Sequence, residues 1–233
     1  MTDSLSKALR RPSVERPTSV LLACGLLAGP LFVGVAVGQV LLRDGFDLTR
    51  HPLSLLSLGE LGWIQVINFV VAGLLSIAFA AGMRRVLHPG RAGTWGPVLV
   101  GAFGAGLVLG GVFITDPSLG FPPGAPEGMP AHYSWHATLH NIAPGISLDA
   151  LILACLVFVR RFAGLRNWRW VTFSAATAVA ILVLSCWPGL DGISIRLATA
   201  LALGFGWMTA LAARLLTETA QSIDPAAEPT FAT

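Results

Sequence analysis

Residues 19–42 read SVLLACGLLAGPLFVGVAVGQVLL and contain no charged residue. A helix needs roughly 20 apolar residues to cross the ~30 Å hydrocarbon core of a bilayer, so this run is long enough to span one. A basic N-terminal segment followed by an apolar run is also typical of a secretory signal peptide. The apolar part of such a peptide has only about 7–15 residues. We therefore predict a retained transmembrane helix, which Pro30 kinks.

The composition assigns the chain to the integral membrane proteins. Hydrophobic residues make up 54% of its 233 positions and charged residues only 12%, against about 25% in a typical soluble domain. The net charge of +3 does not indicate a nucleic-acid partner, because the basic residues lie in short clusters between apolar runs rather than in one patch. The odd count of three cysteines argues against a disulfide framework.

Five further apolar runs are each close to the length that spans a bilayer. They cover residues 63–83, 95–115, 137–159, 170–187 and 195–213. The predicted fold is therefore an all-α membrane protein, a bundle of six transmembrane helices over residues 19–213. We expect a polar tail at residues 1–18 and a disordered tail at residues 214–233. The many glycines of the third run, such as Gly104, indicate close helix packing.

The lysines and arginines predict the orientation in the membrane. With the N-terminus inside, twelve of the fifteen basic residues lie in cytoplasmic segments. Cytoplasmic loops of membrane proteins carry such an excess. The exceptions are Arg43, Arg50 and Arg196. We therefore expect both termini in the cytoplasm and the chemically richer loops on the outer face.

The stretch DGFDLTRHPLSLLSLGELGWIQVINF, residues 44–69, divides at Gly62. After that glycine it belongs to the second span. Before it, the part from Leu53 is too short to span, and Pro52 suits the first position of a helix. We predict a short helix at the outer surface, broken at Gly59 and Gly62, whose leucines face the lipid or the bundle.

Three stretches carry a resemblance to a known family. They are HPLSLLSLGELGWIQVINF from His51, FITDPSLGFPPG from Phe113 and WHATLH from Trp135. Together they resemble the bacterial multipass membrane proteins known as domain of unknown function 998, over roughly residues 20–212. The resemblance implies a helical bundle in the bacterial cytoplasmic membrane. It implies no activity, so no catalytic residue is taken from it.

Histidines recur at every fourth position of HYSWHATLH, as His132, His136 and His140. Neighbours in this series differ by about 40° around a helix and share a face, so His136 and His140 could bind one divalent metal ion. Two histidines are only half of a metal site. The candidates for a further ligand are Asp116, His51 and Glu60. The alternative is that the histidines hydrogen-bond the proline-rich loop.

Asp149 is the ionisable residue expected deepest in the bilayer, about 13 Å beyond His140 on a straight helix. Lipid exposure of a carboxylate is costly, so we expect Asp149 to face the bundle interior. Gln65 and Asn68 share a face of the second span and are its expected partners. These three residues would either line a polar cavity or only fix helix packing. Asp149 and His140 point to opposite sides unless Pro144 bends the helix.

The remaining charged residues of the outer loops each have two interpretations. Asp47 and Glu60 are candidate ligand-binding residues, or they pair with Arg50 inside the loop. Asp116 is a candidate ligand, or it fixes the turn before Pro117. Arg196 neutralises a carboxylate or binds an anionic head group, or its side chain only reaches up to the interface.

Three classes of function fit these patterns. The first is a protein that binds or processes a small or lipid-like molecule in a pocket at the outer face, with His140, Asp116 and His51 as catalytic candidates. The second is a small transporter, which needs a polar route across the bundle. The third is a scaffold or assembly subunit. The sequence shows no nucleophile elbow and no phosphate-binding glycine motif, so it defines no reaction type.

Overall fold

The structure, a computed structural model, describes the backbone of residues 2–189 and 191–223 and the side chains of residues 17–189 and 191–221. Six of its helices are long and apolar enough to cross a membrane, which confirms the predicted fold class. They are α1 (Thr2–Leu42), α2 (Gly62–Leu87), α3 (Arg91–Val112), α4 (Trp135–Gly164), α5 (Trp168–Cys186) and α6 (Ile193–Ile223). The predicted short helix between the first two spans is the 3₁₀ helix η1 (Leu53–Ser57).

Both terminal helices extend beyond the predicted spans. Helix α1 begins at Thr2, so it includes most of the segment that was expected to be a tail. Helix α6 runs on to Ile223, because apolar residues such as Leu215, 4% exposed, still pack on the core there. Part of the segment expected to be disordered is therefore helical. Residues 224–233, the rest of that segment, lie outside the described residues.

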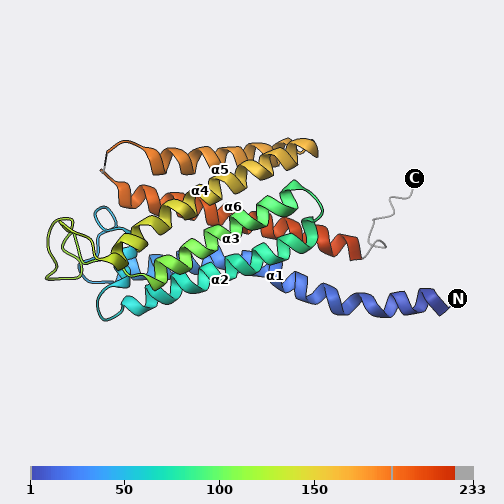
Figure 1. The fold of residues 1–233 in the computed structure, drawn as a ribbon, viewed down its shortest axis with the longest axis horizontal. Coiled ribbons are helices and arrows are strands. Elements are labelled where there is room, and N and C mark those ends of the chain that lie inside the picture. Colours follow the sequence, from blue (N-terminus) through green and yellow to red (C-terminus); the bar gives the residue numbers. More distant parts are fainter. Residues whose placement is uncertain (1, 190, 224–233) are drawn as a thin grey trace.

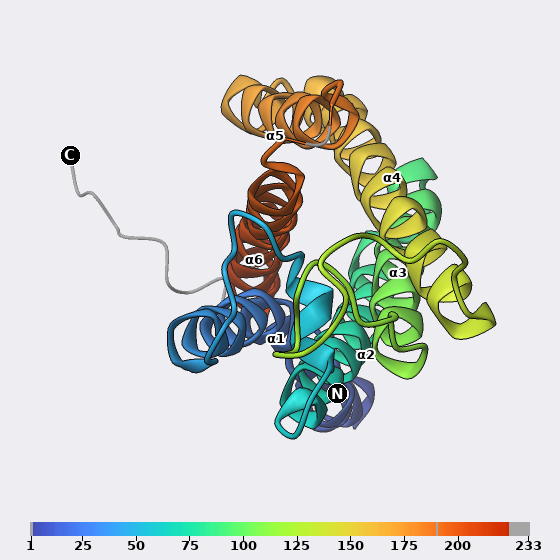
Figure 2. The ribbon, with the colours of Figure 1, turned by 90° about the vertical axis from the view of Figure 1, so that its left-hand side faces the viewer.

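The six helices form a ring in which each packs on the next along the chain and α6 closes against α1. Figure 1 shows them running along the long axis, with the start of α1 and the end of α6 at the same end of the bundle. We call this the terminal end. The opposite end, seen face-on in Figure 2, carries η1 and the long loops, and we call it the loop end.

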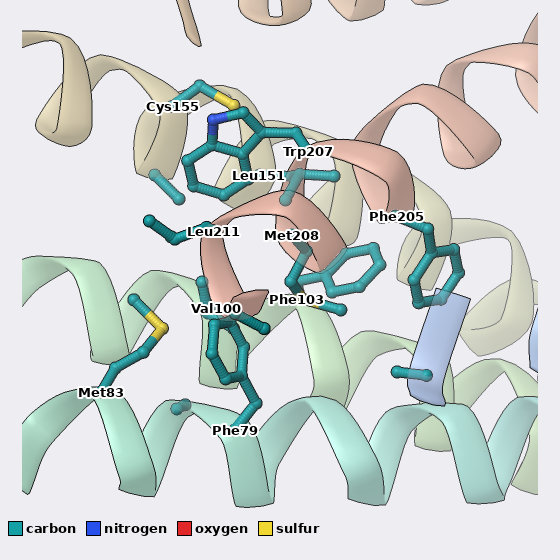
Figure 3. Packing of buried hydrophobic residues seen from close by; sticks show 14 of the residues in the cluster. Phe79, Met83, Val100, Phe103, Leu151, Cys155, Phe205, Trp207, Met208 and Leu211 are labelled. Atoms are coloured by element: carbon teal, nitrogen blue, oxygen red, sulfur yellow. The ribbon is translucent and has the colours of Figure 1, made fainter. Parts of the chain in front are cut away.

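Helix α6 supplies the centre of the hydrophobic core. Figure 3 shows Trp207 and Met208 of α6 among side chains of α2, α3 and α4, including Phe79 and Phe103. Trp207 is fully buried, and its Nε1–H donates to the Ser174 hydroxyl of α5 at 3.0 Å. These core contacts hold α6 against the other helices in the part of the bundle away from the loop end.

Glycines bring α2 and α3 into close contact, as the sequence predicted. A Cβ atom on Gly104 would lie 2.6 Å from the carbonyl oxygen of Gly73, and a Cβ atom on Gly73 would lie 2.5 Å from that of Gly104. Only residues without a side chain permit this approach of two backbones. The contact fixes how α3 lies on α2 and so positions the wall of the cavity described next.

Candidate functional site: an apolar cavity beside His140

An apolar cavity of about 100 Å³ lies in the loop-end half of the bundle. Residues of α2, α3, α4 and α6 form its wall, and Leu53 of η1 contributes from the loop end. Among the lining residues, Phe69, Leu148 and Leu201 are apolar, and His140 of α4 is the ionisable group. The cavity is therefore a mainly hydrocarbon-lined space with one side chain able to exchange a proton.

The cavity exists because α4 and α6 diverge toward the loop end. They touch where a Cβ atom on Gly204 would overlap the side chain of Leu151. One turn closer to the loop end, Leu148 and Leu201 already line the space between the two helices. Pro144, a further turn on, lines the cavity and is exposed. The cavity thus opens sideways between α4 and α6, and η1 covers it.

Hydrogen bonds hold His140 in one orientation and select one tautomer of its neutral ring. Its side chain is 2% exposed, and its Nδ1 lies 3.0 Å from the Gly110 carbonyl oxygen and 2.7 Å from that of Phe113. Carbonyl oxygens only accept hydrogen bonds, so this network assigns the proton to Nδ1 and a lone pair to Nε2 in the neutral ring. Within the described part of the chain, Nε2 has no hydrogen-bond partner.

Two serines beside the cavity also keep acceptor atoms. The Ser147 hydroxyl donates to the Ala143 carbonyl oxygen at 2.8 Å. The Ser194 hydroxyl donates to the Arg50 carbonyl oxygen at 3.1 Å. Each hydroxyl has one proton and two lone pairs, so its acceptor capacity stays free. Together with His140 Nε2, these side chains favour a guest that donates a hydrogen bond.

His51, a second catalytic candidate, fastens two loops together. It is 3% exposed; its Nδ1 accepts the Asp47 backbone N–H at 2.9 Å and its Nε2 lies 3.0 Å from the Leu119 carbonyl oxygen. Both ring nitrogens are therefore occupied. Asp47 accepts two hydrogen bonds from Thr49, and the bonds from the Thr49 side chain and backbone hold the pKa of the Asp47 carboxyl below its usual value. Asp47 is a turn residue here.

Asp116, the third candidate, holds the N-cap residue of α4. Its two carboxylate oxygens accept the backbone N–H and the hydroxyl of Ser134, each at 2.7 Å. Ser134 in turn accepts the Ala137 N–H at 3.1 Å and is the N-cap of α4. Asp116 thus positions the start of the helix that carries His140, which agrees with the interpretation that it fixes a loop.

The predicted metal site of His136, His140 and Asp116 does not form. His136 is exposed and its ring lies tilted against that of Trp135, with ring centroids 3.5 Å apart. His140 directs Nδ1 at backbone carbonyls, and Asp116 binds Ser134, the N-cap residue of α4. Among the residues that the structure describes, no three histidine, cysteine or acidic side chains gather as metal ligands. The histidines would share a face on one continuous helix, but α4 begins after His132, and His136 and His140 have different surroundings.

The expectation that Asp149 faces the bundle interior is wrong. Helix α4 continues through Pro144, so Asp149 stays on the side opposite to His140 and is exposed. Gln65 and Asn68 are buried as predicted, but they meet α1: Gln39 donates to Gln65 Oε1 at 2.7 Å, and Asn68 donates to the Phe32 carbonyl oxygen. These three residues form no common polar route, which removes the support they gave to a transporter.

The other charged candidates also lie away from the cavity. Arg50 pairs with Glu127 of the proline-rich loop at 2.6 Å. Glu60 is exposed and makes no hydrogen bond or ion pair with the residues described. Arg196 donates to the Trp187 and Gly189 carbonyl oxygens at 2.8 and 2.6 Å. It therefore closes the turn between α5 and α6 instead of facing a ligand.

Several residues of the site gave no signal in the sequence. Gly110 and Ser147 read as ordinary residues of apolar runs, and Ser194 as the residue before the last run; only the packing of four helices brings them to one cavity with Pro144. Arg43 was noted only for topology, yet it donates to the Leu56 and Leu58 carbonyl oxygens and so holds η1 in place. The sequence did offer one signal for this contact. Arg43 directly follows an apolar helix, and the short helix nearby has carbonyl groups that need a donor.

The family described as "Protein of unknown function (DUF998)" matches residues 26–214 of the chain. This match includes every residue that lines the cavity, as well as η1. No curated protein and no solved structure matches the chain significantly.

Proposed function

The chain belongs to the DUF998 family, and from its own geometry we propose that it binds a lipid-like molecule, holding an alkyl segment in the cavity and a donor group at His140. The observation that carries this proposal is the apolar cavity lined by His140, whose Nε2 has no hydrogen-bond partner among the described residues. The function proposed is binding at the loop end.

The size of the cavity limits the guest. A dry engineered cavity of roughly 150 Å³ accepts benzene, and this one has about 100 Å³. It therefore suits a few carbons of a linear or branched chain, while the rest of the molecule lies along the open side between α4 and α6. Lipid tails are as apolar as the cavity wall, so transfer from the membrane gains little. Selectivity then depends on shape and on the polar contact.

The polar contact favours a hydroxyl-bearing molecule. His140 Nε2 is an acceptor in the neutral ring, and the Ser147 and Ser194 hydroxyls have already given their protons to backbone carbonyls. A guest with an O–H group completes a hydrogen bond there, whereas a guest that only accepts does not. A long-chain alcohol is the simplest molecule of this class.

Gly110 offers a direct test, because it lines the cavity and a Cβ atom there would meet no atom within 4 Å. We therefore expect the side chain in Gly110→Val to occupy the cavity without a clash. The backbone carbonyl that His140 binds is retained in this variant, so the orientation of His140 should not change. Photolabelling with a long-chain alcohol that carries a diazirine should modify the wild type near Leu148 and Leu201. In Gly110→Val this labelling should fall by about tenfold, as for a loss of ~1.4 kcal/mol.

Gly34→Val is the matched control, because Gly34 also has open space around its Cβ position but is exposed on α1. It should leave the labelling of Leu148 and Leu201 unchanged. Equal labelling of these two residues in the wild type and in Gly110→Val, with both proteins folded, would exclude the cavity as the binding site.

A second candidate function, assembly with a second copy of the chain, is favoured by the exposure of Asp149. Asp149 and its exposed apolar neighbours on α4 form one series of residues with alternating spacings of four and three, the repeat of a coiled-coil seam. The apolar neighbours are Ile142, Ile146, Leu153 and Leu156. A carboxyl group facing lipid costs about 3 kcal/mol on insertion scales. Two copies inserted in the same direction would bring their Asp149 side chains together. One protonated carboxyl group could then donate a hydrogen bond to the other.

Two substitutions of Asp149 test whether it forms a contact between two copies or is only tolerated as an exposed side chain in a monomer. Asp149→Asn retains an interhelical hydrogen bond, so the dimer should persist, whereas Asp149→Leu should yield monomers. Native mass spectrometry of protein released from nanodiscs measures the copy number. A wild-type protein that is monomeric at all concentrations tested would rule this assembly out.

A further inference from the structure

A basic cleft lies at the terminal end of the bundle, far from the cavity beside His140. It has a volume of about 530 Å³ and is formed by the start of α3 and the last turns of α4. Three arginines line it, together with Trp95: Arg91, Arg160 and Arg161. No residue of this cleft belongs to the proposed binding function.

The three guanidinium groups form no ion pair with the acidic side chains that the structure describes. Within the described side chains, none of them makes an ion pair or hydrogen bond. Arg84 and Arg214, at the same end, show the contrast. Arg84 donates to the Gly93 carbonyl oxygen and to the Thr94 hydroxyl, and Arg214 pairs with Glu218 at 2.7 Å. The cleft therefore gathers three positive charges that the described residues leave unneutralised.

The acidic residues are placed so that they do not compensate these arginines. Of the acidic side chains that the structure describes, most lie in the loop-end segments between helices: Asp44, Asp47, Glu60, Asp116, Glu127 and Asp191. Glu218 lies at the terminal end and lines a neighbouring pocket with Arg161, but its ion pair is with Arg214. The start of α3 adds to the positive potential, because its N-cap Gly90 makes no side-chain cap and the first N–H groups of a helix have no partner within it.

The surroundings of the cleft are those of a membrane interface. Trp95 and Leu165 are each 57% exposed. Val157 also lines the cleft, about one turn of α4 farther from the terminal end than Arg160 and Arg161. Tryptophan is enriched at the level of lipid head groups, and basic pockets between transmembrane helices at that level suit anionic head groups. Arginine binds phosphate oxygens in a bidentate manner.

We propose that this cleft binds the phosphate group of an anionic phospholipid head group, with Arg91, Arg160 and Arg161 as its ligands. The phosphate is the shared chemistry of a lipid and of a soluble phosphate compound. The apolar flank at Trp95 and Val157 favours the lipid, because acyl chains can continue along it. The site is independent of the cavity beside His140.

The test compares purified protein in nanodiscs of phosphatidylcholine with and without phosphatidylglycerol. We expect phosphatidylglycerol to raise the thermal midpoint of the wild type by about 5 °C, through binding to the folded state. Native mass spectrometry should show a retained phosphatidylglycerol molecule. In the variant with Arg91→Gln, Arg160→Gln and Arg161→Gln, both effects should be lost. The single variant Arg160→Gln serves if the triple variant does not fold, and its midpoint rise should be at most half that of the wild type.

Arg166→Gln with Arg169→Gln is the control, because these exposed arginines belong to the same end but do not line the cleft. The control should keep the wild-type response. An equal loss in the control, or a wild type that responds equally to both lipid compositions, overturns the proposal. If millimolar inorganic phosphate raises the midpoint in pure phosphatidylcholine as much as phosphatidylglycerol does, the lipid assignment is overturned and a soluble phosphate takes its place.

Discussion

His140 and His51 show how hydrogen bonds at a single residue separate a candidate site from a structural contact. Both histidines are buried. His51 uses both ring nitrogens within the protein, and its ring also packs 5.5 Å from that of Phe121. Among the described residues, His140 finds hydrogen-bond partners for Nδ1 alone. A histidine with one nitrogen anchored and the other facing a cavity is oriented for binding or proton transfer.

Two substitutions of His140 should separate its two roles. In His140→Asn the side-chain amide can still donate to the Gly110 and Phe113 carbonyl oxygens, so the free energy of unfolding should change by less than about 1 kcal/mol. In His140→Leu those buried carbonyls lose their donor, at a cost of about 1–3 kcal/mol. Both variants lack the Nε2 acceptor.

Photolabelling by the diazirine-bearing alcohol should therefore fall in both His140 variants, while denaturation by guanidinium should distinguish them. Asp116→Ala provides the comparison: we expect it to lose about 1 kcal/mol through the weakened cap of α4 and to keep its labelling. Full labelling in His140→Asn would contradict a role for Nε2 in binding.

At the scale of an element, α4 places opposite properties on opposite faces. One face carries His140 and Ser147 at the cavity, and the other carries Asp149 among exposed apolar residues. The helical-wheel angle of about 180° between His140 and Asp149 follows from the sequence. The sequence did not reveal which face would be buried, because both faces of a transmembrane helix are apolar and only neighbouring helices distinguish them.

The contact of α3 with α2 gives a prediction at the same scale. Gly104→Ala would place a methyl group 2.6 Å from the Gly73 carbonyl oxygen, so the backbones must separate, at about 1–3 kcal/mol. Gly101→Ala is the control, because its nearest atom would be the Ala80 Cβ at 3.8 Å, an ordinary contact. Thermal unfolding in detergent should show a lower midpoint for Gly104→Ala only. Equal midpoints would mean that the two helices can move apart freely.

At the scale of the whole molecule, the orientation proposed from the arginines makes the loop end the outer face. In a variant without its three cysteines, Glu127→Cys should react with a membrane-impermeant maleimide in intact cells. Arg166→Cys should react only after the cells are opened, because it lies at the terminal end with the unpaired arginines. The reverse pattern would invert the orientation and place the basic cleft in the outer leaflet.

The sequence by itself determined the number of spans, the short helix before α2 and the close packing of α3, because length, hydropathy and glycine content are local properties. It also identified Gln65 and Asn68 as buried polar residues. Tertiary structure alone decided their partners, the exposure of Asp149 and the cavity beside His140. The physical reason is that these depend on where α4 and α6 separate, and on which helix meets which face. In an apolar chain, hydrophobicity cannot distinguish the surface that faces lipid from the surface that faces another helix.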